Sequence, residues 1–186
     1  VIASEEITSS LFGYGSFDEL SVKNSANALF YFALGLPAFA LIKILSAFLF
    51  ARHNTKIPFY FSLISVIINI SISVLFFEKI GFIIIPISTS ISSWVNVLLL
   101  FIFLIMKKYY VLNSYIILSF LKILCSSSLA TYFFYFLVEN FYSYLQYDSN
   151  YKLFFTILFI ILTFFLYIFI SLLTKAFKFS DIKLKY

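Results

Sequence analysis

Long apolar runs separated by short polar links make up most of the sequence. Each run is long enough to cross a membrane, because about 20 apolar residues in a helix cover the roughly 30 Å of hydrocarbon in a bilayer. The runs are solid apolar blocks, without the alternation of apolar and polar residues that β-barrel strands require. They predict an all-α, polytopic membrane helix bundle of five transmembrane helices, at residues 27–50, 59–77, 82–106, 114–138 and 153–174.

Residues 1–25 differ from the rest because polar residues interrupt the apolar ones. We interpret this segment as the end of a preceding helix followed by an outer loop. Ser16 with Glu19 three residues later fits a capping box, which predicts that a short helix begins at Phe17. Position 1 is Val and no signal peptide precedes the first span, so we expect the chain to begin inside a longer protein.

The polar links alternate in charge along the chain. Net charge is negative before the first span, positive at 51–58, zero at 78–81, positive at 107–113, negative at 139–152 and positive at 175–186. Cytoplasmic loops carry the excess of Lys and Arg. The alternation therefore fits five crossings, with the amino-terminal segment outside and the tail at 175–186 in the cytoplasm. We expect residues 1–186 to form one membrane domain fragment.

Composition argues against several classes of function. Hydrophobic residues make up 63% of the chain and charged residues 11%, whereas about 25% of residues are charged in soluble domains. The net charge of +5 is divided among three links, so we expect no nucleic-acid partner. The chain has one His, His53, and no Asp or Glu within the spans. We therefore expect no enzyme, no catalytic residue and no metal centre, and no cofactor apart from a monovalent coupling cation.

Two lysines lie inside predicted spans. Lys43 would lie about 10 Å from the cytoplasmic end of its span and Lys122 about 12 Å from the same side. Both side chains are long enough to reach the headgroups. The alternative is that they face a hydrated cavity and an anionic substrate, since charged residues within membranes commonly mark substrate paths. Lys43 is therefore a candidate cavity residue.

Uncharged polar residues in the second and third spans form a second candidate site. Asn69 and Ser73 are four residues apart and share one helix face. Thr89 descends the next span to a similar depth, about 10 Å from the outer end, so it should meet Asn69. These three residues would either form hydrogen bonds between helices or contribute oxygens to a cation site. Asn96 is interpreted as an interhelical hydrogen-bonding residue.

Small residues and prolines indicate where helices bend or approach closely. Gly35 and Pro37 fall inside the first span and predict a kink or hinge, because proline cannot donate to the helix ladder. The third span carries small polar residues that permit close helix packing. They are Ser88, Thr89, Ser90, Ser92 and Ser93.

The link at 51–58 is the most informative polar stretch. Asn54 and Thr55 favour turns and helix caps, and Pro58 suits the first turn of a following helix. Arg52 and Lys56 would hold the link on the cytoplasmic face. Arg52 is also placed to meet a phosphate, since its planar guanidinium matches phosphate oxygens. All five are candidates for substrate contact or gating.

The order of these elements resembles the MurJ (MviN) family of lipid II flippases. The likeness covers roughly residues 11–105. It rests on Tyr31 to Leu36, Lys43, Phe50-Ala51-Arg52, Asn54-Thr55-Lys56, Pro58, Asn69, Thr89-Ser90 and Asn96 before a leucine run. Leu11 to Phe17 is similar to the family's Arg-Gly-x-Phe element, with Tyr14 where Arg is usual.

The resemblance implies the carboxy-terminal lobe of a fourteen-helix transporter of the multidrug/oligosaccharidyl-lipid/polysaccharide (MOP) exporter superfamily. Such a protein moves a lipid-linked saccharide pyrophosphate, the peptidoglycan precursor, across the bacterial inner membrane by alternating access. Its partners would be membrane lipids and the missing amino-terminal helices of the same protein. The spans at 114–138 and 153–174 would form an apolar groove for the lipid tail. The alternatives are a related exporter of O-antigen precursors or drugs, and a non-transporting scaffold in cell-wall assembly.

Overall fold

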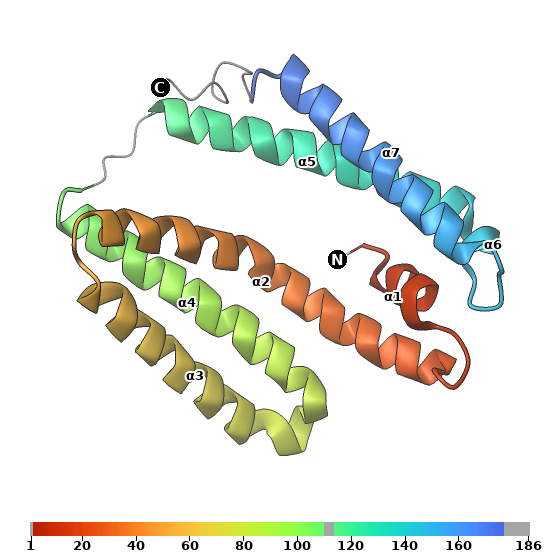
Figure 1. Ribbon diagram of the computed structural model, residues 1–186, viewed down its shortest axis with the longest axis horizontal. Coiled ribbons are helices and arrows are strands. Elements are labelled where there is room, and N and C mark those ends of the chain that lie inside the picture. Colours follow the sequence, from red (N-terminus) through yellow and green to blue (C-terminus); the bar gives the residue numbers. More distant parts are fainter. Residues whose placement is uncertain (1, 110–113, 177–186) are drawn as a thin grey trace. The chain divides into compact units, whose positions relative to one another are not determined.

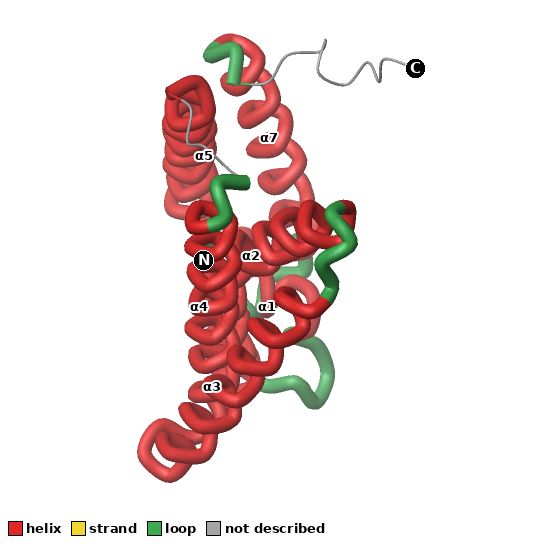
Figure 2. Tube along the Cα trace, turned by 90° about the vertical axis from the view of Figure 1, so that its left-hand side faces the viewer, coloured by secondary structure: helices red, strands yellow, loops and turns green. Residues whose placement is uncertain are grey.

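The computed structural model describes residues 2–109 and 114–176, and their regular structure is helical throughout (Figures 1 and 2). This confirms the predicted all-α class. The elements in chain order are α1 (Ser4–Phe12), α2 (Glu19–Ala51), α3 (Lys56–Ile80), the 3-10 turn η1 (Gly81–Ile83), α4 (Ile84–Met106), α5 (Ser114–Asn140), α6 (Tyr142–Leu145) and α7 (Lys152–Leu173).

Within these described residues, four segments are long and apolar enough to cross a membrane. They are Glu19–Ala51, Lys56–Met106, Leu118–Asn140 and Lys152–Leu173. The second segment has 51 residues and contains both α3 and α4, which turn back on each other at η1. The five long helices fall where five crossings were predicted, and the number of crossings itself stays a prediction.

The start of α2 differs from the capping box predicted at Ser16. The helix begins at Glu19, and Asp18 caps it by accepting a 2.8 Å hydrogen bond from the Ser21 N–H. The hydrogen bonds from Ser21 lower the pKa of the Asp18 carboxyl below its ordinary value. A carboxylate at this position also interacts favourably with the positive end of the helix dipole, which explains why Asp18 is the cap in place of Ser16.

The chain divides into two compact units. One spans 24–111 and holds most of α2 together with α3 and α4; the other joins residues 2–23 to 112–186 and holds α1, α5, α6 and α7. Each unit has a core of its own, and we describe them in turn.

In the first unit, α4 packs against both α2 and α3. A side chain on Gly35 of α2 would place its Cβ 2.8 Å from Ser90 Oγ and 3.3 Å from Ser90 Cα, so glycine is what permits this approach. Ser90 Oγ donates to the Tyr31 carbonyl at 2.5 Å, and Trp94 Nε1 donates to the Leu34 carbonyl at 3.1 Å. The close packing predicted for the serine-rich span therefore occurs, one turn before Pro37.

An apolar cluster closes the other end of this unit. Leu49, Leu100 and Leu104 are buried there, and Ile42, Leu45, Phe48, Ile57, Phe61 and Phe103 pack around them. The polar contacts at Gly35 and this cluster together fix α2 along α4. They position the link between α2 and α3 at the end of the unit.

The second unit is built on α7, against which α1, α5 and α6 pack. Leu137 and Val138 of α5, Leu145 of α6 and Phe159 of α7 form its core. The Tyr144 and Phe155 rings stack with their centroids 4.5 Å apart. Aromatic packing therefore holds the short helix α6 onto the start of α7.

Replacing Gly35 with Val should destabilise the α2–α4 contact. The added Cβ would overlap Ser90 Oγ, and overpacking of this kind costs about 1–3 kcal/mol. We expect a lower melting temperature for the full-length protein in detergent, partly restored by Ser90→Ala. Leu36→Val, on the exposed face of the same turn, is the matched control. Equal melting temperatures for Gly35→Val and the control would contradict this account.

Candidate functional site

The link between α2 and α3 is held by backbone hydrogen bonds. The Asn54 N–H donates to the Leu49 carbonyl at 3.0 Å and the His53 N–H donates to the Phe50 carbonyl at 2.9 Å. His53 has a φ of 57°, so this pattern is a Schellman motif with His53 at the left-handed position. Asn54 Oδ1 then accepts from the Ile57 N–H at 3.3 Å. Asn54 thus both ends α2 and caps α3.

The other predicted residues of the link have more modest structural roles. Thr55 makes no side-chain cap hydrogen bond, although the sequence favoured one. Pro58 is buried in the first turn of α3, as predicted. Thr55, Lys56 and Pro58 line a pocket of about 640 Å³ together with Ser46, Phe50, Phe59, Tyr60 and Ser62.

Arg52 is the link residue best placed to meet an anion. Its guanidinium carbon lies 4.7 Å from the Phe48 ring centroid and 4.4 Å from that of Tyr109, which follows α4. Two aromatic faces therefore hold the cation in place. The side chain is exposed, and the described residues supply it with no carboxylate partner. An Arg fixed in this way keeps its N–H groups available for phosphate oxygens.

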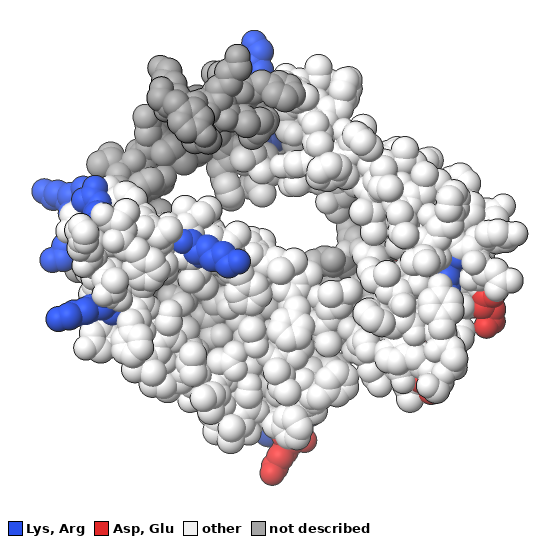
Figure 3. Space-filling model, viewed as in Figure 1, with Lys and Arg blue, Asp and Glu red and all other residues white. Residues whose placement is uncertain are grey.

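Basic side chains gather at this end of the first unit (Figure 3). Arg52 and Lys56 come from the link, and Lys107 and Lys108 follow α4. The turn between α3 and α4 at the opposite end has Glu78 and Lys79 beside it. Lys43 is exposed on α2, and its ammonium has no hydrogen bond or ion pair to any described residue.

The predicted contact between the second and third spans is confirmed. Asn69 Nδ2 donates to Thr89 Oγ1 at 3.0 Å, and Thr89 Oγ1 donates in turn to the Ile85 carbonyl at 2.7 Å. Ser73 does not join them directly, because its hydroxyl is paired with that of Ser88 at 2.7 Å. Each side chain of the candidate ion site therefore has a protein partner, and the ion site stays a prediction.

Asn96 also bonds between helices, as predicted. Its Nδ2 donates to Ser62 Oγ at 3.5 Å, while its Oδ1 is buried without a partner. The residue lines a cavity of about 400 Å³ with Ile42, Ser62, Ser65, Val66, Asn69, Ile70, Thr89, Ser92 and Ser93. These side chains are all uncharged, and the described part of the chain contains no group of three or more His, Cys, Asp or Glu suited to a metal ion.

Lys152 is an important residue that the sequence analysis did not identify. Charge counting assigned it to a solvated link, yet only 2% of it is exposed. Its Nζ donates to the carbonyls of Gly13 and Tyr147, both at 2.7 Å, and lies 4.3 Å from the Tyr14 ring centroid. The sequence feature that could have indicated its burial is the position of this lysine beside clustered tyrosines at the start of an apolar run. Tyr14, which stands where the resemblance expects Arg, contacts a cation from α7.

Comparison with known proteins gives a consistent result. A family model described as lipid II flippase MurJ matches residues 1–149. The probable lipid II flippase MurJ of Rickettsia prowazekii is 40% identical over 101 residues, which are 54% of this chain and 20% of that protein. The corresponding proteins of Rhizobium meliloti and Thermotoga maritima are 36% and 40% identical over 59% and 48% of this chain. The chain spans about a fifth of the length of these relatives.

Replacing Lys152 with Met should destabilise the second unit. The carbonyls of Gly13 and Tyr147 would lose their donor, and a buried acceptor without a partner costs about 1–3 kcal/mol. We expect a lower melting temperature for the full-length protein in detergent, with faster proteolysis in the loop between α1 and α2. The exposed Lys23 in the same unit provides the control Lys23→Met. Unchanged melting and proteolysis in Lys152→Met would contradict the structural role.

Proposed function

The chain belongs to the lipid II flippase MurJ family, and on that premise we propose that it is the carboxy-terminal part of a flippase for a lipid-linked peptidoglycan precursor. It is a multi-pass bacterial membrane protein of a transporter family. The missing amino-terminal helices would complete the substrate path, and the carboxy-terminal tail would lie in the cytoplasm. The protein would act without covalent catalysis, by alternating between inward-open and outward-open states.

The environment of Arg52 is the observation that supports the proposal most directly. Its guanidinium is exposed, lacks a carboxylate partner among the described residues and is held between two rings. A pyrophosphate group supplies the oxygen pairs that such a fork binds through two parallel hydrogen bonds. Lys56 and the pocket at the start of α3 lie on the same link. They would extend the contact with the pyrophosphate or move together with Arg52. Lys43 would contribute a second cation from α2.

A monovalent cation is the proposed coupling ion, with Asn69 and Thr89 as its ligands on this part of the protein. Their side chains meet at 3.0 Å, and Ser73 lies one turn along α3. Neutral oxygens alone bind a cation weakly. The remaining charge would therefore come from the missing helices. Gly35 and Pro37 are the proposed hinge, since Pro37 lies inside α2 and cannot donate to the helix ladder.

The two alternative functions receive no specific support. The relatives described above are all probable lipid II flippases, which favours neither an exporter of O-antigen precursors or drugs nor a scaffold without transport activity. No contact in the described residues points to either class.

The test is complementation of a conditional flippase mutant by the full-length gene carrying Arg52→Ala. We expect loss of growth at normal membrane levels of the protein, because the phosphate contact is lost. Arg52→Lys should restore growth in part, since it keeps the charge but not the planar fork. Lys107→Ala removes a neighbouring cation and should grow normally. Normal growth of Arg52→Ala, or equal loss in Lys107→Ala, would reject a specific role for Arg52.

The fragment itself provides a further prediction. Residues 1–186 expressed alone should not rescue the same mutant, because the chain spans about a fifth of its relatives and would lack most of the substrate path. The full-length gene should rescue it. Growth supported by the fragment alone, with its membrane level confirmed by blot, would show that these helices suffice for transport.

A further inference from the structure

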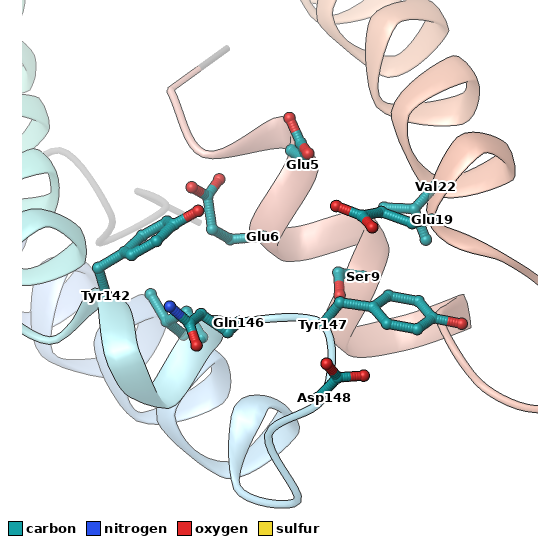
Figure 4. A pocket seen from close by; sticks show the side chains of 10 residues that line it. Glu5, Glu6, Ser9, Glu19, Val22, Tyr142, Gln146, Tyr147 and Asp148 are labelled. Carbon is teal, nitrogen blue, oxygen red and sulfur yellow. The ribbon is translucent and has the colours of Figure 1, made fainter.

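A pocket of about 310 Å³ lies in the second unit, between α1, the first turn of α2 and the segment around α6 (Figure 4). It is lined by Glu5, Glu6, Ser9, Glu19, Val22, Tyr142, Leu145, Gln146, Tyr147 and Asp148. All of these residues belong to the same unit. The pocket has no part in the flippase proposal, which concerns the helices of the first unit.

The charged side chains that line this pocket are all acidic. Four side chains carry carboxylates, and no Lys, Arg or His is among the lining residues. Lys152 interacts electrostatically with Asp148, but two carbonyls hold its ammonium outside the lining. Glu5, Glu6 and Glu19 form no ion pair with any described residue. Figure 4 shows these three carboxylates arranged around one side of the pocket.

Ser9 provides an independent indication of a ligand. Only 4% of this residue is exposed, and its Oγ is buried without a hydrogen-bond partner. It nevertheless contributes to the pocket lining (Figure 4). Buried hydroxyls normally have a partner, because an unpaired one costs free energy. A ligand with N–H groups would supply that partner from within the pocket.

The arrangement of the acidic groups identifies the class of ligand. The described residues contain no carboxylate cluster that converges on a metal ion, so the negative charges are spread over a larger volume. About 310 Å³ is the lower end of the range for small-molecule sites. Tyr142 adds an aromatic side chain, which suits organic ammonium groups. We propose that this pocket binds an organic cation carrying two or more ammonium groups.

The proposal is tested with spermidine and the full-length protein in an uncharged detergent. Isothermal titration should show one saturable site per chain. Glu6→Gln and Glu19→Gln should each weaken the Kd about tenfold, because each removes a charge-assisted hydrogen bond. Glu139→Gln changes an exposed carboxylate of the same unit that does not line the pocket, and should bind with the original affinity.

Ser9→Ala separates the ligand contact from a structural role. Without ligand, the variant should melt at the same temperature as the original protein or higher, because it removes an unpaired buried hydroxyl. Its Kd for spermidine should nevertheless be several-fold weaker. Unchanged affinity in this variant would overturn the assignment of Ser9 to the site.

Three other results would overturn the proposal as a whole. The first is the absence of saturable spermidine binding. The second is binding of Mg²⁺ or Ca²⁺ alone with an affinity equal to that for spermidine, which would identify a simple metal or counterion site. The third is an equal loss of affinity in Glu139→Gln, which would show that net charge alone is responsible. Flippase complementation does not enter any of these measurements, so the two proposals fail separately.

Discussion

The contact between Gly35 and Ser90 is the constraint on which the first unit depends. A helix in hydrocarbon gains little from packing apolar surface against apolar surface, so close backbone approach and hydrogen bonds between helices must hold it. Glycine on α2 permits that approach, and the serine opposite donates to a main-chain carbonyl one turn earlier. The leucine cluster near residue 100 then fixes the far end of α2. These two contacts therefore set the position of the link that carries Arg52.

The α3–α4 interface is also held by hydrogen bonds between helices, here between neutral side chains. Asparagine, serine and threonine side chains pair across it at three levels. Neutral partners avoid the cost of burying a charge, so the interface is stable without a counterion. A cation entering here would have to compete with hydrogen bonds that already exist, and the side chains that line the cavity between these helices include no carboxylate. The proposed ion coupling at this interface would therefore require negative charge from elsewhere in the protein.

The sequence predicted those features that depend on length and spacing along a helix. Depth along two neighbouring helices was enough to bring Asn69 to Thr89, because helical rise is constant. The partner of Ser73 was missed, since rotation about the helix axis decides which of two adjacent hydroxyls it meets. Lys152 was missed for a different reason: loop-charge counting treats every lysine as solvated. Only a tertiary contact with the carbonyls of Gly13 and Tyr147 shows that this one is buried.

Among the described residues, α2, α4 and α7 end in the same way. Their ends connect local backbone structure with the predicted orientation in the membrane. Schellman hydrogen bonds close α2, α4 and α7 with His53, Lys108 and Lys175 at the left-handed position, where glycine is usual. A residue with a side chain costs about 1–2 kcal/mol there, and a cation near the helix carboxyl end recovers about 0.3–1 kcal/mol from the dipole. These ends also fall in the three links predicted to be cytoplasmic. A lysine at such a position serves both as a helix cap and as a charge that opposes transfer across the membrane. If these links are cytoplasmic as predicted, Lys108 and Lys175 supply positive charge expected on that face, at positions where glycine would be less strained.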